Sequence, residues 1–334
     1  MPQQFLILQT AFLGDVVLAT ALAEKLHRVY PDAAIDFMVR RGNESLLQGH
    51  PFLRQVLVFD KKNKLSSMAA LIRQIRRTRY DLLVNIQRFA SSGVIAALSG
   101  AREIVGFDKN PLAFSFTRAF PHHIASPGEE PVHEVQRNLS LLKGWIDDDG
   151  PALPRLYPPP EAYQGIPSGP YLCMAPTSVW FTKQWPAERW VALIRSMPEQ
   201  LTIALLGAPS DRTTCALIQE KSGHPGVINK AGELSLLESA AWMQHAQMNY
   251  VNDSAPVHIA SAVGAPVTAI FCSTVPAFGF GPLSPLSRIV ETPEPLECRP
   301  CGLHGFRACP RGHFRCSEIP LELVKDGASH QIII

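Results

Sequence analysis

Short apolar segments alternate with segments of helical periodicity along most of this 334-residue chain, and this alternation restricts the fold more than any other feature. In the first half the apolar segments predict strands at 5–9, 34–39, 55–59, 81–86 and 102–106. Helices are expected between and after them, from the end of the first strand to Pro31 and at 66–78, 91–99 and 132–146. Strands separated by helices are typical of βαβ units, so we expect an α/β fold with a mostly parallel sheet.

A proline-rich segment divides the chain into two such halves. Residues 151–170 contain seven prolines, a density that the interior of a helix or strand does not tolerate. We therefore predict a linker at 151–170, between a first domain at 1–150 and a second domain at 171–334. In the second domain we expect strands at 171–175, 201–206, 248–252 and 266–272, and helices at 186–197, 211–221, 235–247 and 255–263. A cleft between two α/β domains is the natural place for a ligand.

Charge and hydropathy exclude several classes of protein. Lysine and arginine number 31 and acidic residues 29, so the net charge is +2 and a strongly basic nucleic-acid-binding protein is not expected. The first residues lack a basic region and Asp15 interrupts their apolar run, which argues against a signal peptide. No charge-free apolar run of about 18 residues predicts a transmembrane helix. We expect a protein of the reducing cytoplasm, with Cys173, Cys215 and Cys272 as buried free thiols.

Gly14 and Asp15 stand where the first strand meets the first helix. A glycine there permits a tight turn and the close approach of a ligand. An aspartate kept ionised by the helix N-terminus can act as a general base. The alternative is that Asp15 only caps the helix.

Polar side chains also follow strands of the second half. Thr177 and Ser178 come after the strand at 171–175 and Lys183 follows shortly, a pattern suited to a phosphate group. Asp211 follows the strand at 201–206 and could accept hydrogen bonds from a ribose. The alternatives are a solvated polar loop around Lys183 and a helix cap at Asp211.

A third turn of this kind begins at Asp253 and Ser254, after the strand at 248–252. The helix that opens there contains Ala255 and His258, and the free amides at a helix start bind anions. The two polar residues could instead be caps, and a lone histidine is more often a core residue. Taken together, the turns of the second half predict a nucleotide-type ligand, facing an aspartate from the first half.

Four cysteines are grouped in the segment 298–316, at Cys298, Cys301, Cys309 and Cys316. Four thiolates near one point suit a structural zinc or iron ion, and His304 and His313 are spare ligands. Free thiols in a packed loop and disulfides are the alternatives. The same segment contains several arginines, which either form a solvated basic loop or contact anionic groups: Arg299, Arg307, Arg311 and Arg315.

In their order along the chain, four stretches resemble glycosyltransferase family 9, the ADP-heptose:lipopolysaccharide heptosyltransferases. They are LQTAFLGDVVLATAL, TSVWFTKQWPAERW, AGELSLLESA and NDSAPVHIASAVGAPVTAIF. The resemblance implies a GT-B fold, in which two Rossmann-like domains with mostly parallel sheets face a central cleft. It implies an inverting transfer of heptose from ADP-heptose, bound by the second domain, to a lipopolysaccharide inner-core acceptor, bound by the first. The acceptor is lipid-linked, so the protein is expected in the cytoplasm and peripherally at the inner membrane surface.

The resemblance also implies roles for individual residues. Asp15 is the expected catalytic base, and Thr177, Ser178 and Lys183 are expected to hold the donor diphosphate, with Lys183 also stabilising the leaving group. Asp211 is expected at the ribose. The residues expected to face the phosphates and sugar lie around the third turn: Asp253, Ser254, Ala255 and His258.

The chain departs from the family at Ala255, where glycine is common, and this methyl group could restrict the approach of the diphosphate. Lysine and helix dipoles carry the charge in this scheme, so no cofactor is required, although cysteine-rich segments of related transferases raise the expectation of a structural metal. The candidate acceptor ligands compete with an ordinary surface role: Gly14, Arg40, Arg41, Arg88 and Lys109.

Other functions would use the same features. A GT-B transferase for another nucleotide sugar, a GT-B epimerase and a non-catalytic nucleotide-sugar-binding protein all fit two α/β halves. A two-lobed solute receptor requires an export signal, which is not predicted here. A dehydrogenase is disfavoured because Gly279-x-Gly281 lacks the third glycine of the dinucleotide fingerprint.

Overall fold

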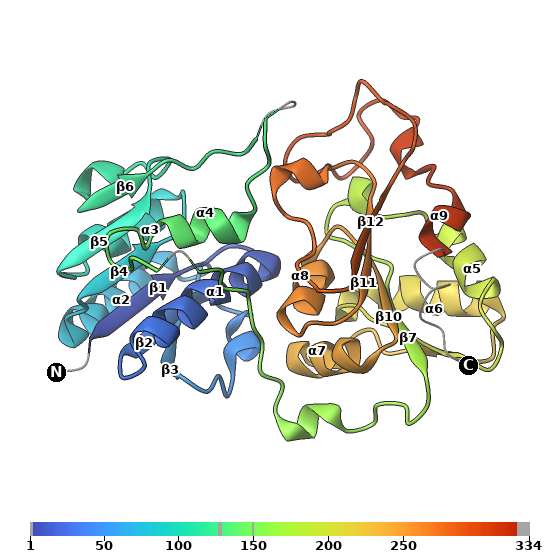
Figure 1. The fold of residues 1–334 in the computed structure, drawn as a ribbon, viewed down its shortest axis with the longest axis horizontal. Coiled ribbons are helices and arrows are strands. Elements are labelled where there is room, and N and C mark those ends of the chain that lie inside the picture. Colours follow the sequence, from blue (N-terminus) through green and yellow to red (C-terminus); the bar gives the residue numbers. More distant parts are fainter. Residues whose placement is uncertain (1–2, 126–128, 149, 326–334) are drawn as a thin grey trace. The chain divides into compact units, whose positions relative to one another are not determined.

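The computed structural model describes residues 3–125, 129–148 and 150–325. By its internal contacts the chain divides into two compact units, Met1–Tyr157 and Pro158–Ile334, and each contains one parallel sheet with helices packed on it (Figure 1). The boundary between the units lies within the predicted linker. The proline-rich segment still contains a short 3-10 helix, Pro160–Tyr163. This helix begins with proline, which is compatible with the first turn of a helix.

In the amino-terminal unit, the described residues form a six-stranded parallel sheet. From edge to edge its strands are β3 (Leu53–Phe59), β2 (Ala34–Arg40), β1 (Gln4–Leu8), β4 (Leu82–Asn85), β5 (Glu103–Phe107) and β6 (Arg118–Phe120). The helices are α1 (Leu13–Val29), α2 (Lys64–Thr78), α3 (Ala90–Ala97) and α4 (Glu134–Ser140). The strand order reverses between β1 and β4, and doubly wound sheets bind ligands beyond the carboxyl ends of the strands at such a switch point.

The carboxyl-terminal unit repeats this topology within its described part. Its strands are, in spatial order, β12 (Ser287–Glu291), β11 (Val267–Phe271), β10 (Met248–Asn252), β7 (Tyr171–Ala175), β8 (Thr202–Leu205) and β9 (Val227–Asn229). The helices are α5 (Ala187–Arg195), α6 (Arg212–Ser222), α7 (Leu236–His245), α8 (Ala255–Ala262) and α9 (Leu321–Lys325). Here the order reverses between β7 and β10, which places the second switch point at the ends of these two strands.

Burial on both faces explains the unbroken apolar runs of the sequence. All four residues from Phe5 to Leu8 in β1, and all five of β7, are buried, as expected for central strands of a parallel sheet covered on both sides. The predicted core thiols Cys173, Cys215 and Cys272 are confirmed as buried and free.

The helix predicted at 132–146 is wrong in its extent, because α4 ends at Ser140. The chain then continues in tight turns, closed for example by the hydrogen bond from the Trp145 amide to the Leu142 carbonyl (2.9 Å). Gly144 has a φ of +78°. This left-handed conformation is incompatible with a continuing helix, and glycine is the residue that adopts it most readily.

Strands β6, β9 and β12 were absent from the sequence prediction, and all three are edge strands. Two of them are only three residues long. The third, β12, has a single buried residue, Val290. An edge strand is covered by fewer neighbours and needs no continuous apolar run, so hydrophobic periodicity does not reveal it.

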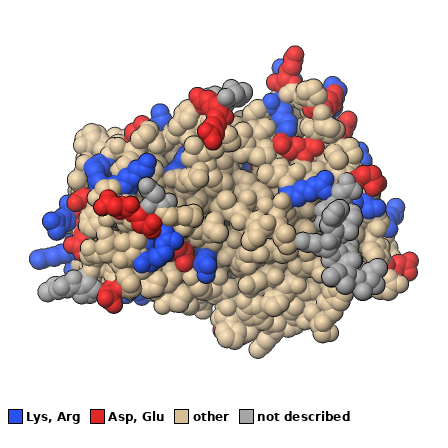
Figure 2. Space-filling view, viewed as in Figure 1, with Lys and Arg blue, Asp and Glu red and all other residues tan. Residues whose placement is uncertain are grey.

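None of the helices within the described residues is long and apolar enough to cross a bilayer. On the face shown in Figure 2, basic and acidic side chains lie interspersed over the amino-terminal unit, and neither sign forms a continuous field.

Candidate active site

Asp15 lies in the first turn of α1, just beyond the carboxyl end of the central strand β1. Its Oδ2 accepts a hydrogen bond from the Phe12 backbone N–H (3.1 Å), so the side chain does cap the helix. It is nevertheless only half-buried. Gly14 lies in the same turn and places no side chain next to the carboxylate. The cap and a role at the sheet edge are therefore compatible.

The predicted acceptor ligands end or follow the strands on either side of β1. Arg40 ends β2, and its guanidinium lies 5.1 Å from the ring centroid of Phe12. Arg41 pairs with Asp60 (3.2 Å). Arg88 is exposed and follows β4. Because β2 and β4 flank β1 in a parallel sheet, these basic residues and the turn of Asp15 belong to the same edge.

Lys109 lies in the turn after β5, one strand further from β1. The structure thus puts it on the same carboxyl edge of the sheet, but not on a strand that neighbours β1.

In the carboxyl-terminal unit, Thr177 and Ser178 follow β7 and are half-buried. The Ser178 carbonyl accepts a hydrogen bond from Gln184 Nε2 (2.7 Å), which ties this turn to the end of the 3-10 helix η4 (Phe181–Lys183). The predicted phosphate-binding turn and the predicted lysine are thus parts of one local structure.

Lys183 is held by Asp253. Its Nζ lies 2.7 Å from Asp253 Oδ2, and the two side chains are 15% and 5% exposed. The Thr274 hydroxyl donates to the same carboxylate oxygen. A lysine ammonium has three N–H donors, so two remain for a ligand when one is given to Asp253.

The role of Asp253 at the phosphates of the donor stays a prediction. Its carboxylate is buried and engaged by Lys183 and Thr274, and a carboxylate turned toward a diphosphate would repel it. In the structure the Asp253 side chain contacts the ammonium group of Lys183.

Helix α8 begins at Ala255, directly after Asp253 and Ser254, at the second switch point. The Ser254 hydroxyl donates to the Asn252 carbonyl (3.3 Å) and does not cap the helix. Pro256 has no N–H, and the Val257 N–H donates to the Ser254 carbonyl (3.0 Å). Of the first three residues of α8, Ala255 is therefore the one whose amide can serve an anion at this helix start. The methyl group of Ala255 is half-buried at this helix start.

His258 and Asp211 behave more as the alternatives predict. His258 is 6% exposed and its ring lies edge-on to Phe280, which fits a core position. Its role at the donor stays a prediction. Asp211, at the end of η5 (Pro209–Asp211), accepts a hydrogen bond from the Ala208 amide (2.8 Å), which is a cap. Asp211 is half-buried, and its role at a ribose stays a prediction.

All seven cysteines are free thiols, which removes the disulfide alternative for the segment 298–316. Cys298 Sγ lies 3.8 Å from His313 Nε2. Burial, and then the neighbouring Cys301 thiolate, raise the pKa of Cys316 to about 11. Burial also raises the pKa of Cys309, but backbone N–H groups outweigh it and leave this pKa below its usual value.

The four thiols therefore gather, but they do not present a preformed metal site. Among the residues that the structure describes, no group of three or more histidine, cysteine or acidic side chains is arranged to hold a metal ion. The zinc or iron ion stays a prediction from the cysteine spacing.

Ser273 and Thr274, which follow β11, are not among the site residues predicted from the sequence. The signal was available, because polar residues after a strand end had identified the other turns. Arg299, which the sequence predicts in a solvated basic loop or in contact with anionic groups, instead donates to the carbonyls of Cys272 (2.7 Å) and Thr274 (2.7 Å). No local pattern predicts that pairing.

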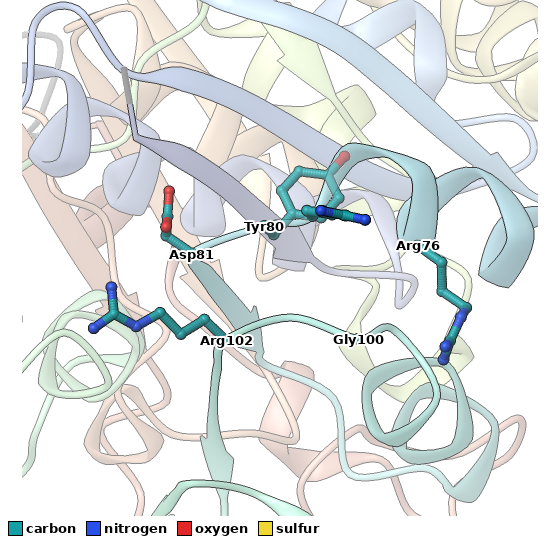
Figure 3. Close-up of a pocket in the computed structure, with 6 residues that line it drawn as sticks. Arg76, Tyr80, Asp81, Gly100 and Arg102 are labelled. Atoms are coloured by element: carbon teal, nitrogen blue, oxygen red, sulfur yellow. The ribbon is translucent and has the colours of Figure 1, made fainter. Parts of the chain in front are cut away.

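A cavity of about 340 Å³ lies away from these residues, in the amino-terminal unit. Its lining includes Tyr80 and Asp81, just before β4, with Arg76 and Arg102 on opposite sides (Figure 3). It is therefore at the amino edge of the sheet, opposite the edge where Asp15 lies, and is not part of the candidate active site.

Two doubly wound α/β units, each with polar side chains at its switch point, are the architecture predicted for a GT-B glycosyltransferase. The model of glycosyltransferase family 9 (heptosyltransferase) matches residues 68–303. This match covers more than half of the chain, and the chain belongs to that family. The family resemblance and the prediction of a glycosyltransferase are confirmed.

Individual relatives agree with this assignment. The chain is 28% identical over 281 residues to lipopolysaccharide heptosyltransferase 3 of Escherichia coli, covering 79% of this chain and 82% of the relative. The solved ADP-heptose lipopolysaccharide heptosyltransferase II of E. coli is similar with a TM-score of 0.75 at 18% identity, covering 98% and 100% of the two chains. The crystal structure of a family 9 glycosyl transferase from Veillonella parvula is similar with a TM-score of 0.80 at 19% identity. The similarity covers 98% of this chain and 96% of that one. These structures confirm the GT-B fold.

Proposed function

We propose that this glycosyltransferase moves a heptose from ADP-heptose to a hydroxyl group of a lipopolysaccharide inner-core acceptor, with inversion at the anomeric carbon. The observation that carries the proposal is the Lys183–Asp253 ion pair at the switch point of the carboxyl-terminal sheet, in a chain whose other switch point carries Asp15. The donor is supported by the relative from E. coli whose name includes ADP-heptose. The acceptor is supported by the lipopolysaccharide heptosyltransferases among the relatives.

On the acceptor side, Asp15 acts as the general base. The acceptor oxygen forms a bond to the anomeric carbon while its proton passes to the Asp15 carboxylate. The hydrogen bond from the Phe12 amide to Oδ2 fixes the orientation of this carboxylate. The helix dipole favours the negative charge of a carboxylate in the first turn, and the charged form is the one that can accept a proton.

On the donor side, the bond between the anomeric carbon and the β-phosphate oxygen breaks, and ADP leaves with the electron pair. Lys183 donates hydrogen bonds to the diphosphate and stabilises the charge that develops on it. The Ala255 amide at the start of α8 and the hydroxyls of Thr177 and Ser178 bind the same group. Asp253 keeps the ammonium group in place without contacting the phosphates.

We further propose that the enzyme works as a peripheral protein at the cytoplasmic face of the inner membrane. Its acceptor is anchored in a lipid, and Arg40, Arg41 and Arg88 supply positive charge at the edge where Asp15 receives the acceptor. Sedimentation with anionic vesicles containing the acceptor tests this. Retention of the protein in the supernatant contradicts it.

No step of this mechanism passes through a metal ion. The zinc or iron ion predicted for the segment 298–316 would be structural, and the spacing of its four cysteines is what supports it. Elemental analysis of protein purified without chelators tests the prediction. A stoichiometric zinc or iron content supports it, and a metal-free protein contradicts it.

The proposed activity is tested by incubating the purified protein with ADP-heptose and an inner-core acceptor that lacks the heptose. We expect acceptor-dependent release of ADP and a product heavier by one heptose residue in the mass spectrum. UDP- and GDP-sugars serve as controls and should not react. Transfer from one of these sugars in place of ADP-heptose would refute the proposed donor, and donor binding without transfer to any core acceptor would refute the proposed acceptor.

A further inference from the structure

The first part of the cysteine-rich segment packs against the residues around Lys183, which are the proposed donor-binding residues of the carboxyl-terminal unit. We refer to residues 299–306 as the strap. The Cys301 amide donates to the Ser273 carbonyl (2.8 Å), in the turn after β11. The strap also reaches η4, so it contacts both polypeptide stretches from which the surroundings of Lys183 are built.

Thr182 is the residue before Lys183, and its hydrogen-bonding groups are paired with Phe306 of the strap and with Ser273. Its backbone N–H donates to the Phe306 carbonyl (3.1 Å). Its hydroxyl accepts from the Phe306 amide (2.8 Å) and the Ser273 hydroxyl (3.0 Å), and it donates to the Phe306 carbonyl (3.3 Å). A hydroxyl has one donor and two acceptor sites, and all of them are used. Thr182 is 1% exposed, so water cannot replace these partners without a structural change.

Gly305 allows this close approach. It is buried and has a φ of +75°. A Cβ added there would lie 2.9 Å from Thr182 Oγ1 and 3.2 Å from Lys183 Cγ. Any side chain at this position must therefore push the strap and η4 apart, and the lysine stem is among the first groups displaced.

A second chain of contacts leads from the strap to the same lysine. Arg299 donates to the Thr274 carbonyl (2.7 Å), and the hydroxyl of Thr274 donates to Asp253. Asp253 in turn holds Lys183 Nζ at 2.7 Å. The same guanidinium nitrogen of Arg299, Nη2, also pairs with Glu291 of β12.

We propose that the strap positions Lys183 for the donor diphosphate, with Gly305 and Phe306 acting through Thr182, and Arg299 acting through Thr274 and Asp253. These are positioning residues, because none of them is required to touch the donor. The inference rests on the proposed role of Lys183. It assigns a function to the cysteine-rich segment that does not depend on a metal ion.

The test compares Gly305→Ala with Gly312→Ala. Both glycines have a φ of +75°, so both substitutions impose the same backbone strain, but a Cβ at Gly312 meets nothing within 4 Å. The readout is the Kd of ADP, measured by calorimetry on the full chain. Losing one charge-assisted hydrogen bond weakens binding by roughly tenfold or more, so we expect the Kd to rise by that factor in Gly305→Ala and to stay at the wild-type value in Gly312→Ala. The melting temperature should fall in both variants, and further in Gly305→Ala, because its Cβ also meets the Thr182 hydroxyl.

A cycle with Lys183→Met shows whether the effect passes through the lysine. In that background Gly305→Ala should cause no further loss of ADP affinity. An equal loss with and without the lysine would contradict a positioning role.

Arg299→Lys provides a second variant if Gly305→Ala does not fold, since a single ammonium cannot replace the bonds of the guanidinium. The exposed Arg307, changed to lysine, is its control. Normal ADP binding by both Gly305→Ala and Arg299→Lys overturns the positioning role of the strap and leaves the proposed function standing. A wild-type protein that does not bind ADP overturns the proposed function and this inference with it.

Discussion

Removing the ammonium group of Lys183 should destabilise the carboxyl-terminal unit through the carboxylate that it leaves behind. In Lys183→Met, the Asp253 carboxylate, which is 5% exposed in the wild type, keeps the Thr274 hydroxyl as its side-chain partner among the residues that the structure describes. An unpaired buried charge costs about 3–5 kcal/mol of unfolding free energy. At roughly 2–4 °C for each kcal/mol in a unit of this size, the melting temperature should fall by about 6–20 °C. Adding Asp253→Asn removes the charge and should recover most of the loss.

The assay is denaturant unfolding. It compares the wild type with Lys183→Met, Asp253→Asn and the variant that carries both substitutions. Lys230→Met is the matched control, because Lys230 pairs with Glu233 at 3.2 Å but the side chains are 31% and 37% exposed. A surface pair of this kind contributes less than about 1 kcal/mol. The reasoning fails if Lys183→Met costs no more than Lys230→Met, or if the cost is the same with and without the Asp253 carboxylate.

Two further predictions concern the stability of each unit. Burial, and then the charge of His27, lower the pKa of His50 to about 4. The unfolded chain therefore binds a proton at pH 5 that the folded chain does not, and the amino-terminal unit should lose about 2 kcal/mol of unfolding free energy between pH 7 and pH 5. Denaturant titrations should show that His50→Leu abolishes this contribution, and an unchanged pH dependence would contradict it. In the other unit, a Cβ at Gly226 would lie 2.2 Å from the Leu201 carbonyl oxygen, whereas one at Gly169 meets nothing within 4 Å. Gly226→Ala should lower the unfolding free energy by about 1–3 kcal/mol, and Gly169→Ala should lower it much less. Equal melting temperatures of the two variants would refute the packing argument.

Hydrophobic periodicity predicts the central part of both sheets because buried parallel strands leave a strong pattern in the sequence. β1, β7 and β10 coincide closely with predicted strands, since nearly every residue in them is buried. The edge strands β6, β9 and β12 leave no such pattern. The positive φ of Gly144 prevents the helix of α4 from continuing to residue 146. The leucines before this glycine have helical spacing, so the sequence pattern does not indicate the earlier end.

The position of the candidate site in the chain was predictable, but its internal pairing was not. Asp15, Thr177 and Asp253 each follow a strand, and a local pattern reveals this. The partner of Asp253 is Lys183, far away in the sequence, and only the adjacent ends of β7 and β10 bring them together. The strap is less predictable still, because Gly305 and Arg299 act through contacts with backbone carbonyls and a neighbouring hydroxyl.

The central claim is that Asp15 removes the acceptor proton in a transfer from ADP-heptose. The most direct test is the transfer rate of Asp15→Asn at saturating ADP-heptose and acceptor, measured together with the Kd of the donor. Asparagine keeps an oxygen that can accept from the Phe12 amide, so the cap of α1 and the fold are retained. The exposed Asp32, changed to asparagine, controls for the loss of one charge. We predict a rate at least roughly 100-fold lower, as expected for removal of a general base, with an unchanged donor Kd and a normal Asp32→Asn enzyme. A near-normal rate in Asp15→Asn contradicts the mechanism.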